Sequence, residues 1–219
     1  ASVQAVLTAA AATGGAVVFP RGACRLSTAV TATVAAGKSL TIIGQGADAT
    51  ELKFDSGVNG VALTLGSQRS SVHVRDLTVA TVGGVSGTTG ISLTLASSTN
   101  PAAAAQNDFT NVTVRGHDGY AGANYWDTGI YVIGASYVAY NQVNVFGNAS
   151  ATAANCVRVV GTTSAIAVVH NFIGSSMNWC TNNLWLDVYT QGVTVAQSNF
   201  VGGAYGIYQP SGTGTTQLN

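Results

Sequence analysis

Two short patterns recur along the chain at steps of 23 to 39 residues, and no other feature of the sequence constrains the fold as strongly. In the first pattern a small or amide residue precedes alternating apolar positions. Its copies begin at Gly60, Gly90, Gly129, Cys156, Asn183 and Gly206. In the second pattern a polar residue precedes another alternating pair, at Asp76, Asn111, Gln142, Asn171 and Asn199. Such strict alternation predicts short strands that bury one face.

A repeat of this length with strands and no helical pattern predicts one coil of a parallel β-solenoid. The N-terminal segment differs, because Val3 to Ala12 contains good helix formers and follows Ser2, which suits an N-cap. A helix there would cover the open end of the solenoid. We therefore expect a capping helix over 1–13 and a β-solenoid over 14–219. No matching cap follows Gly206, so we expect the solenoid to be truncated, continued or covered by a partner there.

The composition excludes several function classes. Only 7% of residues are charged, and 8 Lys and Arg balance 8 Asp and Glu, so no basic surface favours nucleic acid. No apolar stretch approaches the ~20 residues of a membrane span, and we expect no membrane insertion.

The three cysteines cannot all pair, and none has the spacing of a zinc site. Buried free thiols are the expected state, with a disulfide between Cys156 and Cys180 as the alternative. We expect no metal and no cofactor.

The segment 14–50 carries a distinctive series of motifs. Gly14-Gly15 precedes the apolar Val17 to Phe19, Pro20-Arg21-Gly22 forms a turn, and Leu40 to Ile43 leads into a second glycine turn. This series resembles the opening of the pectate-lyase-like superfamily, which implies a right-handed, single-stranded parallel β-helix. The calcium-binding aspartates and the paired Lys and Arg of pectate lyases are missing, as are the paired aspartates of polygalacturonases.

Within that superfamily, a charge-poor chain rich in Asn, Thr and Gly with a helical cap is most similar to bacteriophage tailspikes and polysaccharide depolymerases. The resemblance implies a homotrimer that binds, and cleaves, a bacterial capsule or lipopolysaccharide. It also implies a place on the virion tail or outside the cell.

Stacking of the coils about 4.8 Å apart converts the repeat into vertical columns of side chains. The second residue after each start of the first pattern should face outward, in the column Ala62, Ser92, Tyr131, Arg158, Trp185 and Tyr208. Aromatic rings stack on the C–H faces of sugars, and Arg binds their oxygens. We predict that Tyr131, Arg158, Trp185 and Tyr208 bind carbohydrate. Two alternatives are that the column only stabilises neighbouring strands or lies in a trimer interface.

The 39-residue step contains an insertion, Arg115 to Asp127, which is rich in ionisable and aromatic groups. Glycines let such a loop fold compactly, and functional residues concentrate on loops. We expect the loop to lie beside the column and predict that Tyr125 and Trp126 add carbohydrate contacts.

Glycoside hydrolysis needs two carboxyl groups. Asp127 and Asp187 are the predicted acid and base, with Asp118 as a further candidate. Asp127 and Asp187 belong to coils two apart but differ by six positions along the strand direction. The two carboxyl groups can therefore pair only if the loop folds back over the column. Asp48, Glu51, Asp55, Asp76 and Asp108 are assigned to the N-terminal coil, turns and caps.

A lyase would instead use His117 or a tyrosine as the base, with Arg115 or Arg158 neutralising the carboxylate of an acidic sugar. The alternative for the segment around His117 is a solvated turn.

Three hypotheses follow for the function. The first is a tailspike depolymerase, and the second is a non-catalytic glycan-binding or structural trimeric shaft. The third, less favoured because its metal-binding carboxylates are missing, is a secreted pectate-lyase-like enzyme.

Overall fold

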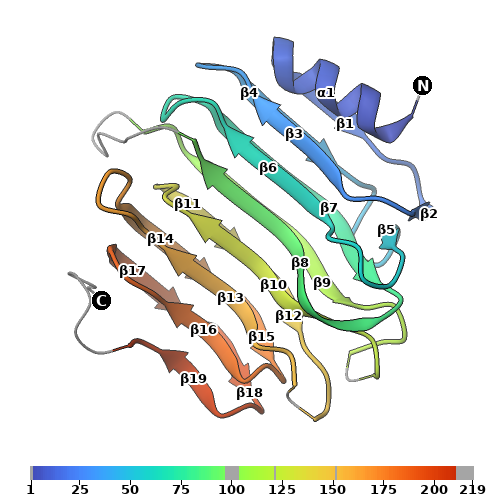
Figure 1. Ribbon diagram of the computed structural model, residues 1–219, viewed down its shortest axis with the longest axis vertical. Helices are drawn as coiled ribbons and strands as arrows, with labels where there is room; N and C mark the ends of the chain where they lie inside the picture. The colour runs from blue at the N-terminus through green and yellow to red at the C-terminus, as the bar shows by residue number, and fades with distance from the viewer. Residues whose placement is uncertain (1, 97–103, 121, 151, 211–219) are drawn as a thin grey trace.

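The computed structural model describes residues 2–96, 104–120, 122–150 and 152–210 (Figure 1). One helix, α1 (Val3–Thr13), precedes a stack of parallel strands. A seven-stranded sheet contains β3 (Val30–Val34), β6 (Val61–Leu65), β8 (Gly84–Leu95), β10 (Tyr125–Ile133), β13 (Asn155–Val160), β16 (Asn182–Leu186) and β19 (Tyr205–Tyr208), in that order.

The second sheet has twelve strands in two neighbouring stacks. The first stack holds β1 (Gly15–Val18), β4 (Ser39–Ile43), β7 (Ser71–Thr81), β9 (Asn107–Gly116), β11 (Val138–Asn141), β14 (Ala167–Ile173) and β17 (Thr190–Ala196). The other adds β2 (Gly22–Leu26), β5 (Thr50–Phe54), β12 (Asn144–Phe146), β15 (Ser176–Asn178) and β18 (Asn199–Val201). Each coil runs through both stacks and then the seven-stranded sheet, so the predicted parallel β-helix is confirmed.

The N-terminal helix caps the first coil, as predicted. The Ser2 hydroxyl accepts the Ala5 N–H at 3.2 Å, and Gly14 ends the helix with φ of 82°. The Gln4 side chain donates to the Thr31 carbonyl at 2.6 Å and accepts the Thr31 N–H at 2.9 Å. One amide thereby pairs backbone groups at the edge of β3 that would otherwise be free to add another strand.

The polar residues of the second pattern mark a bend between the two stacks. Asp76, Asn111 and Gln142 adopt left-handed backbone with φ of 56°, 52° and 54°, a region that Asn and Asp tolerate better than most residues. The last two members of the pattern, Asn171 and Asn199, do not lie at this bend. Asn171 lies inside β14 opposite Ala139, and Asn199 begins β18. The bend in those coils is made by Gly174 and Gln197.

The first pattern lies at a tight corner inside the seven-stranded sheet. A Cβ on Gly60 would lie 2.0 Å from the Gly90 carbonyl oxygen, and one on Gly129 would lie 2.6 Å from the Cys156 carbonyl oxygen. Glycine is therefore required at Gly60 and Gly129 by the close approach of successive coils.

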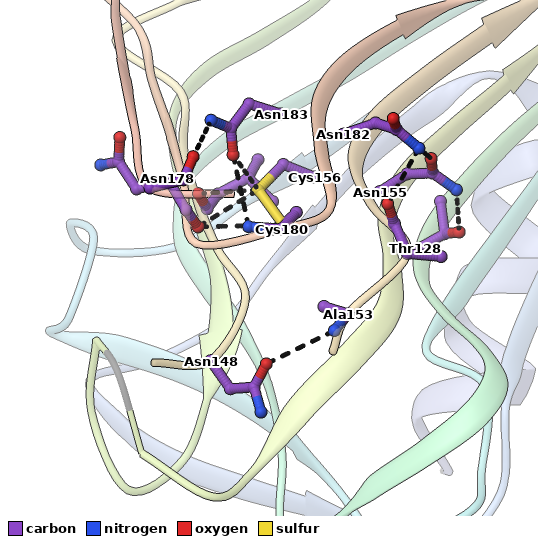
Figure 2. The surroundings of a disulfide bond; sticks show 12 residues. Thr128, Asn148, Ala153, Asn155, Cys156, Asn178, Cys180, Asn182 and Asn183 are labelled. Carbon is purple, nitrogen blue, oxygen red and sulfur yellow. Dashed lines mark hydrogen bonds between the residues drawn. A yellow bond between two sulfur atoms is a disulfide. The ribbon is translucent and has the colours of Figure 1, made fainter. Parts of the chain in front are cut away.

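Cys156 occupies that corner and forms a disulfide with Cys180 (Figure 2). Both half-cystines are buried, and the Asn183 side-chain oxygen accepts the Cys180 N–H at 3.3 Å. The expectation of free thiols is wrong for this pair, because the chain turns at Trp179, whose φ is 60°, and brings Cys180 to the same corner. Cys24 is free but partly exposed, so the expected burial is also wrong there.

Reduction of the disulfide is expected to destabilise the protein. The bond closes a loop of 24 residues, and releasing a loop of that size from the cross-link costs about 3 kcal/mol. The double substitution Cys156→Ala and Cys180→Ala should lower the free energy of unfolding by about that amount in urea denaturation.

The substitution Cys24→Ala serves as the control and should leave the urea midpoint nearly unchanged. Equal effects of the two variants would contradict the assigned connectivity.

Candidate functional site

The predicted outward column is present on the seven-stranded sheet. Its members pair in register from coil to coil, in the order Ala62, Ser92, Tyr131, Arg158, Trp185 and Tyr208. The alternating residues Ile130, Val157 and Leu184 are fully buried, so this column faces away from the core. We call Tyr131, Arg158, Trp185 and Tyr208 the ladder.

The ladder is a continuous stack of rings around one cation. The Arg158 guanidinium carbon lies 5.1 Å from the centre of the Tyr131 ring and 4.2 Å from that of Trp185. Tyr208 contacts Trp185 edge-on at 5.5 Å between ring centres. Each cation–π contact contributes about 0.5 to 2 kcal/mol, so the ladder is held in place before any ligand binds.

Asp187, directly after β16, holds the guanidinium from the side. Arg158 donates from Nε at 3.1 Å and from Nη2 at 2.5 Å to the same carboxylate oxygen of Asp187. The other Asp187 oxygen accepts the Val188 N–H at 2.8 Å. The Asp187 side chain is 12% exposed, and its contacts are those of an ion-pair partner.

A shallow groove of about 220 Å³ lies next to the ladder, where the column changes from small residues to rings. Its lining comprises Asn59, Gly60, Val61, Ala62, Thr89, Ser92, Thr94, Tyr131 and Ile133. Because Ala62 and Ser92 are short, the groove is open beside the Tyr131 ring. The groove thus combines one aromatic wall with hydroxyl and amide groups.

The other predicted carboxylate, Asp127, lies at the opposite end of the strands. Its two oxygens accept the Gly87 N–H at 2.8 Å and the Ala154 N–H at 3.3 Å, in the coils on either side. Asp127 lies about six residues, roughly 20 Å, before Asp187 along the strand direction. The fold-back that an acid–base pair required is absent from the described residues, so the structure does not bring Asp127 and Asp187 together.

The predicted 115–127 loop is shorter than expected, because β9 extends to Gly116 and β10 begins at Tyr125. Asp118 shapes the loop by accepting the N–H groups of Ala123 and Asn124 at 2.7 and 3.1 Å. This contact gives Asp118 a structural role.

Trp126 does not face solvent, contrary to the sugar-binding prediction. Its side chain is 1% exposed, and it donates to the Val79 carbonyl at 3.3 Å and packs edge-on against Phe54. Tyr125 packs over Gly84 and against the core. The Trp126 ring therefore cannot contact a sugar, whereas Tyr125 is half-buried on β10, six residues before Tyr131.

The loop lies on the twelve-stranded sheet, not beside the ladder as expected. His117 Nδ1 contacts Glu51 Oε1 at 2.6 Å, Arg115 contacts Asp48 at 3.1 Å, and the Tyr120 hydroxyl donates to Asp48 at 2.9 Å. We call Asp48, Glu51, Arg115, His117 and Tyr120 the loop cluster. Sequence reasoning assigned the two acids to the N-terminal coil, because no repeat or spacing links positions 48 and 51 to the loop.

Two members of the loop cluster, Asp48 and Tyr120, have shifted pKa values. Partial burial alone would raise the pKa of Asp48, but the Tyr120 hydrogen bond and the Arg115 guanidinium outweigh it and hold that pKa below its usual value. The same hydrogen bond raises the pKa of Tyr120, with partial burial adding to it. Asp48 is therefore ionised and Tyr120 protonated at neutral pH.

The remaining histidines lie elsewhere. His73 pairs with Asp108, which also accepts two hydrogen bonds from Arg75. His170 is fully buried beside Tyr140, and burial lowers its pKa to about 4. Within the ranges that the structure describes, no three His, Cys, Asp or Glu side chains gather as a metal site, and no helix is long and apolar enough to span a membrane.

Comparisons with known proteins leave the family open. No family model matches the chain, and no curated protein matches it. One similar solved structure is the A-module of the mannuronan C-5 epimerase AlgE4 from Azotobacter vinelandii, at 13% identity and a TM-score of 0.31. The alignment covers 98% of this chain and 94% of that one. A similarity at this level shows neither family nor function.

The ladder contacts predict an unequal response to two matched substitutions. Arg158→Lys removes the flat guanidinium that lies between two rings and donates twice to Asp187, and we expect a loss of about 1–2 kcal/mol in unfolding free energy. Arg25→Lys alters a similar pair with Asp55 in which Arg25 is 74% exposed. Because solvent screens an exposed pair, we expect a smaller loss of unfolding free energy from this variant.

Urea denaturation of both variants measures the difference. Equal losses would mean that the rings add nothing to the Arg158 site.

Proposed function

We propose that this chain is a polysaccharide-binding β-helix of the phage tailspike type, and that the ladder binds an extended glycan from a bacterial surface. The observation that carries the proposal is the ladder itself: four side chains from four successive coils form one face beside a groove. A ligand that lies along the stacking direction can contact several coils at once.

The chemistry of this face suits sugars. Aromatic rings accept the C–H faces of pyranose rings by dispersion, and hydroxyl groups pair with the sugar hydroxyls. Tyr131 presents its ring to the groove, and Ser92 and Thr94 supply hydroxyls on the floor. Since the ladder is already held by its own contacts, little side-chain entropy is lost on binding.

The proposal includes a location on the virion tail or outside the cell. The Cys156–Cys180 disulfide supports an oxidising environment, because such bonds persist in secreted and surface proteins and are rare in the cytosol. On the sequence resemblance alone, we extend the proposal to a homotrimer.

A second candidate function is cleavage of a polysaccharide, as in a tailspike depolymerase. The observation that favours it is the His117–Glu51 contact in the loop cluster. A carboxylate that accepts from Nδ1 fixes the tautomer and leaves Nε2 as a base. His117 is 41% exposed, so a substrate can reach it. This site lies on a different sheet from the ladder.

Binding through the ladder is tested with two substitutions at one position. Tyr131→Ala removes the groove wall, and we expect the dissociation constant for a host polysaccharide to rise on the order of tenfold, as for an interface hot spot. Tyr131→Phe keeps the ring and should bind nearly as the wild type.

Isothermal titration with capsule and lipopolysaccharide preparations makes the measurement. If Tyr131→Ala binds as tightly as the wild type, the ladder is not the binding face.

Cleavage is tested separately by following reducing ends and the absorbance of unsaturated uronates. New reducing ends alone mean hydrolysis, and both signals together mean elimination. We expect His117→Ala to lose on the order of 10²-fold in rate, the usual contribution of a general base, while binding at the ladder is kept.

Absence of both signals with every polysaccharide that binds would leave a non-catalytic binding module. Full turnover by His117→Ala would remove His117 from the mechanism.

A further inference from the structure

The charges of the ladder face discriminate between classes of glycan. We infer that this face selects a neutral polysaccharide and disfavours one whose sugars carry carboxylates, an inference that rests on the binding function proposed above.

The ladder face carries few charges, and they do not favour an anion. The strands of the seven-stranded sheet, all within the described residues, contain one charged residue of each sign, Arg158 and Asp127, and Asp187 follows β16 directly. Asp187 forms an ion pair with Arg158, so the two charges at the ladder cancel, and Asp127 lies roughly 20 Å away along the strand direction. A polyanion that lies along the ladder therefore gains no net electrostatic attraction, and its carboxylates find no unpaired cation there.

The one cation is already engaged on three sides. The rings of Tyr131 and Trp185 lie within 5.1 and 4.2 Å of the guanidinium carbon. Nε and Nη2 both donate to Asp187. A sugar carboxylate could receive a two-pronged arginine contact only if Arg158 left its ion pair, which would leave the buried Asp187 without its cation.

The groove beside the ladder is lined by groups that suit a neutral sugar. Ser92, Thr89 and Thr94 carry hydroxyls, which both donate and accept, as the hydroxyls of a neutral sugar do. A carboxylate only accepts, and its strongest partners are charged donors. The lining of this groove includes no lysine, arginine or histidine.

The test compares each polysaccharide with its own neutral derivative. Uronate-containing capsules are chemically carboxyl-reduced, so that backbone, linkage and length are kept while the charge is lost. Polysaccharides without uronates complete the panel. For a binding backbone, we expect the reduced form to bind the full chain at least about tenfold more tightly than the acidic parent, because no carboxylate then loses water without gaining a cationic partner. Its affinity should also be unchanged between about 50 and 500 mM salt.

Added charge provides a second, matched measurement. Thr94→Lys places a cation in the groove and should raise affinity for the acidic parent several-fold, while Thr33→Lys adds the same charge two coils away and should not. Thr33 is an exposed residue of β3, so neither variant is expected to disturb the core.

The outcomes separate the inference from the function on which it rests. Tighter binding of the acidic parent by the wild type, or an affinity that falls with salt, overturns the neutral-glycan inference and leaves ladder binding intact. Equal gains from the two lysine variants also overturn it, because the groove would then have no special place in charge recognition. If no polysaccharide of either kind binds, or if binding survives Tyr131→Ala, the proposed ladder function fails and the inference fails with it.

Discussion

The register between successive coils is the constraint on which the rest of the structure depends. Parallel pairing places residues 23 to 39 positions apart directly over one another, and the buried alternate residues prevent a slip by one position. A one-residue shift in β10 would turn Ile130 outward and Tyr131 into the core. The tight corner at Gly60, Gly90 and Gly129 adds a second constraint, because only small residues fit where the coils approach each other.

This constraint explains which features were predictable from the sequence. The column from Ala62 to Tyr208 follows from two-residue periodicity and a repeat, both of which are written in the chain, and its order was predicted correctly. The bend residues of the last coils were misaligned because Asn171 and Asn199 carry the same local signal as a bend residue but pair inside strands.

Loop conformation was not predictable in the same way. The loop cluster joins Glu51 to His117 across 66 positions, and their contact depends on how a non-repeating loop folds. The burial of Trp126 was missed for a related reason. The sequence placed this residue in a loop, whereas it begins a strand and points inward toward Phe54. Periodicity is informative only where the chain repeats.

The disulfide and the ladder belong to the same part of the solenoid. Cys156 lies two residues before Arg158 on β13, and Cys180 lies at the corner that leads into β16, which carries Trp185. A side-chain hydrogen bond joins the same two coils, because the Asn182 amide donates to the Asn155 side-chain oxygen at 3.0 Å (Figure 2). The covalent link therefore restrains the two coils whose side chains make the shortest cation–π contact, at 4.2 Å. A ladder that needs several coils to stay in register gains most from a cross-link at this point, since local opening of either coil would separate Arg158 from Trp185.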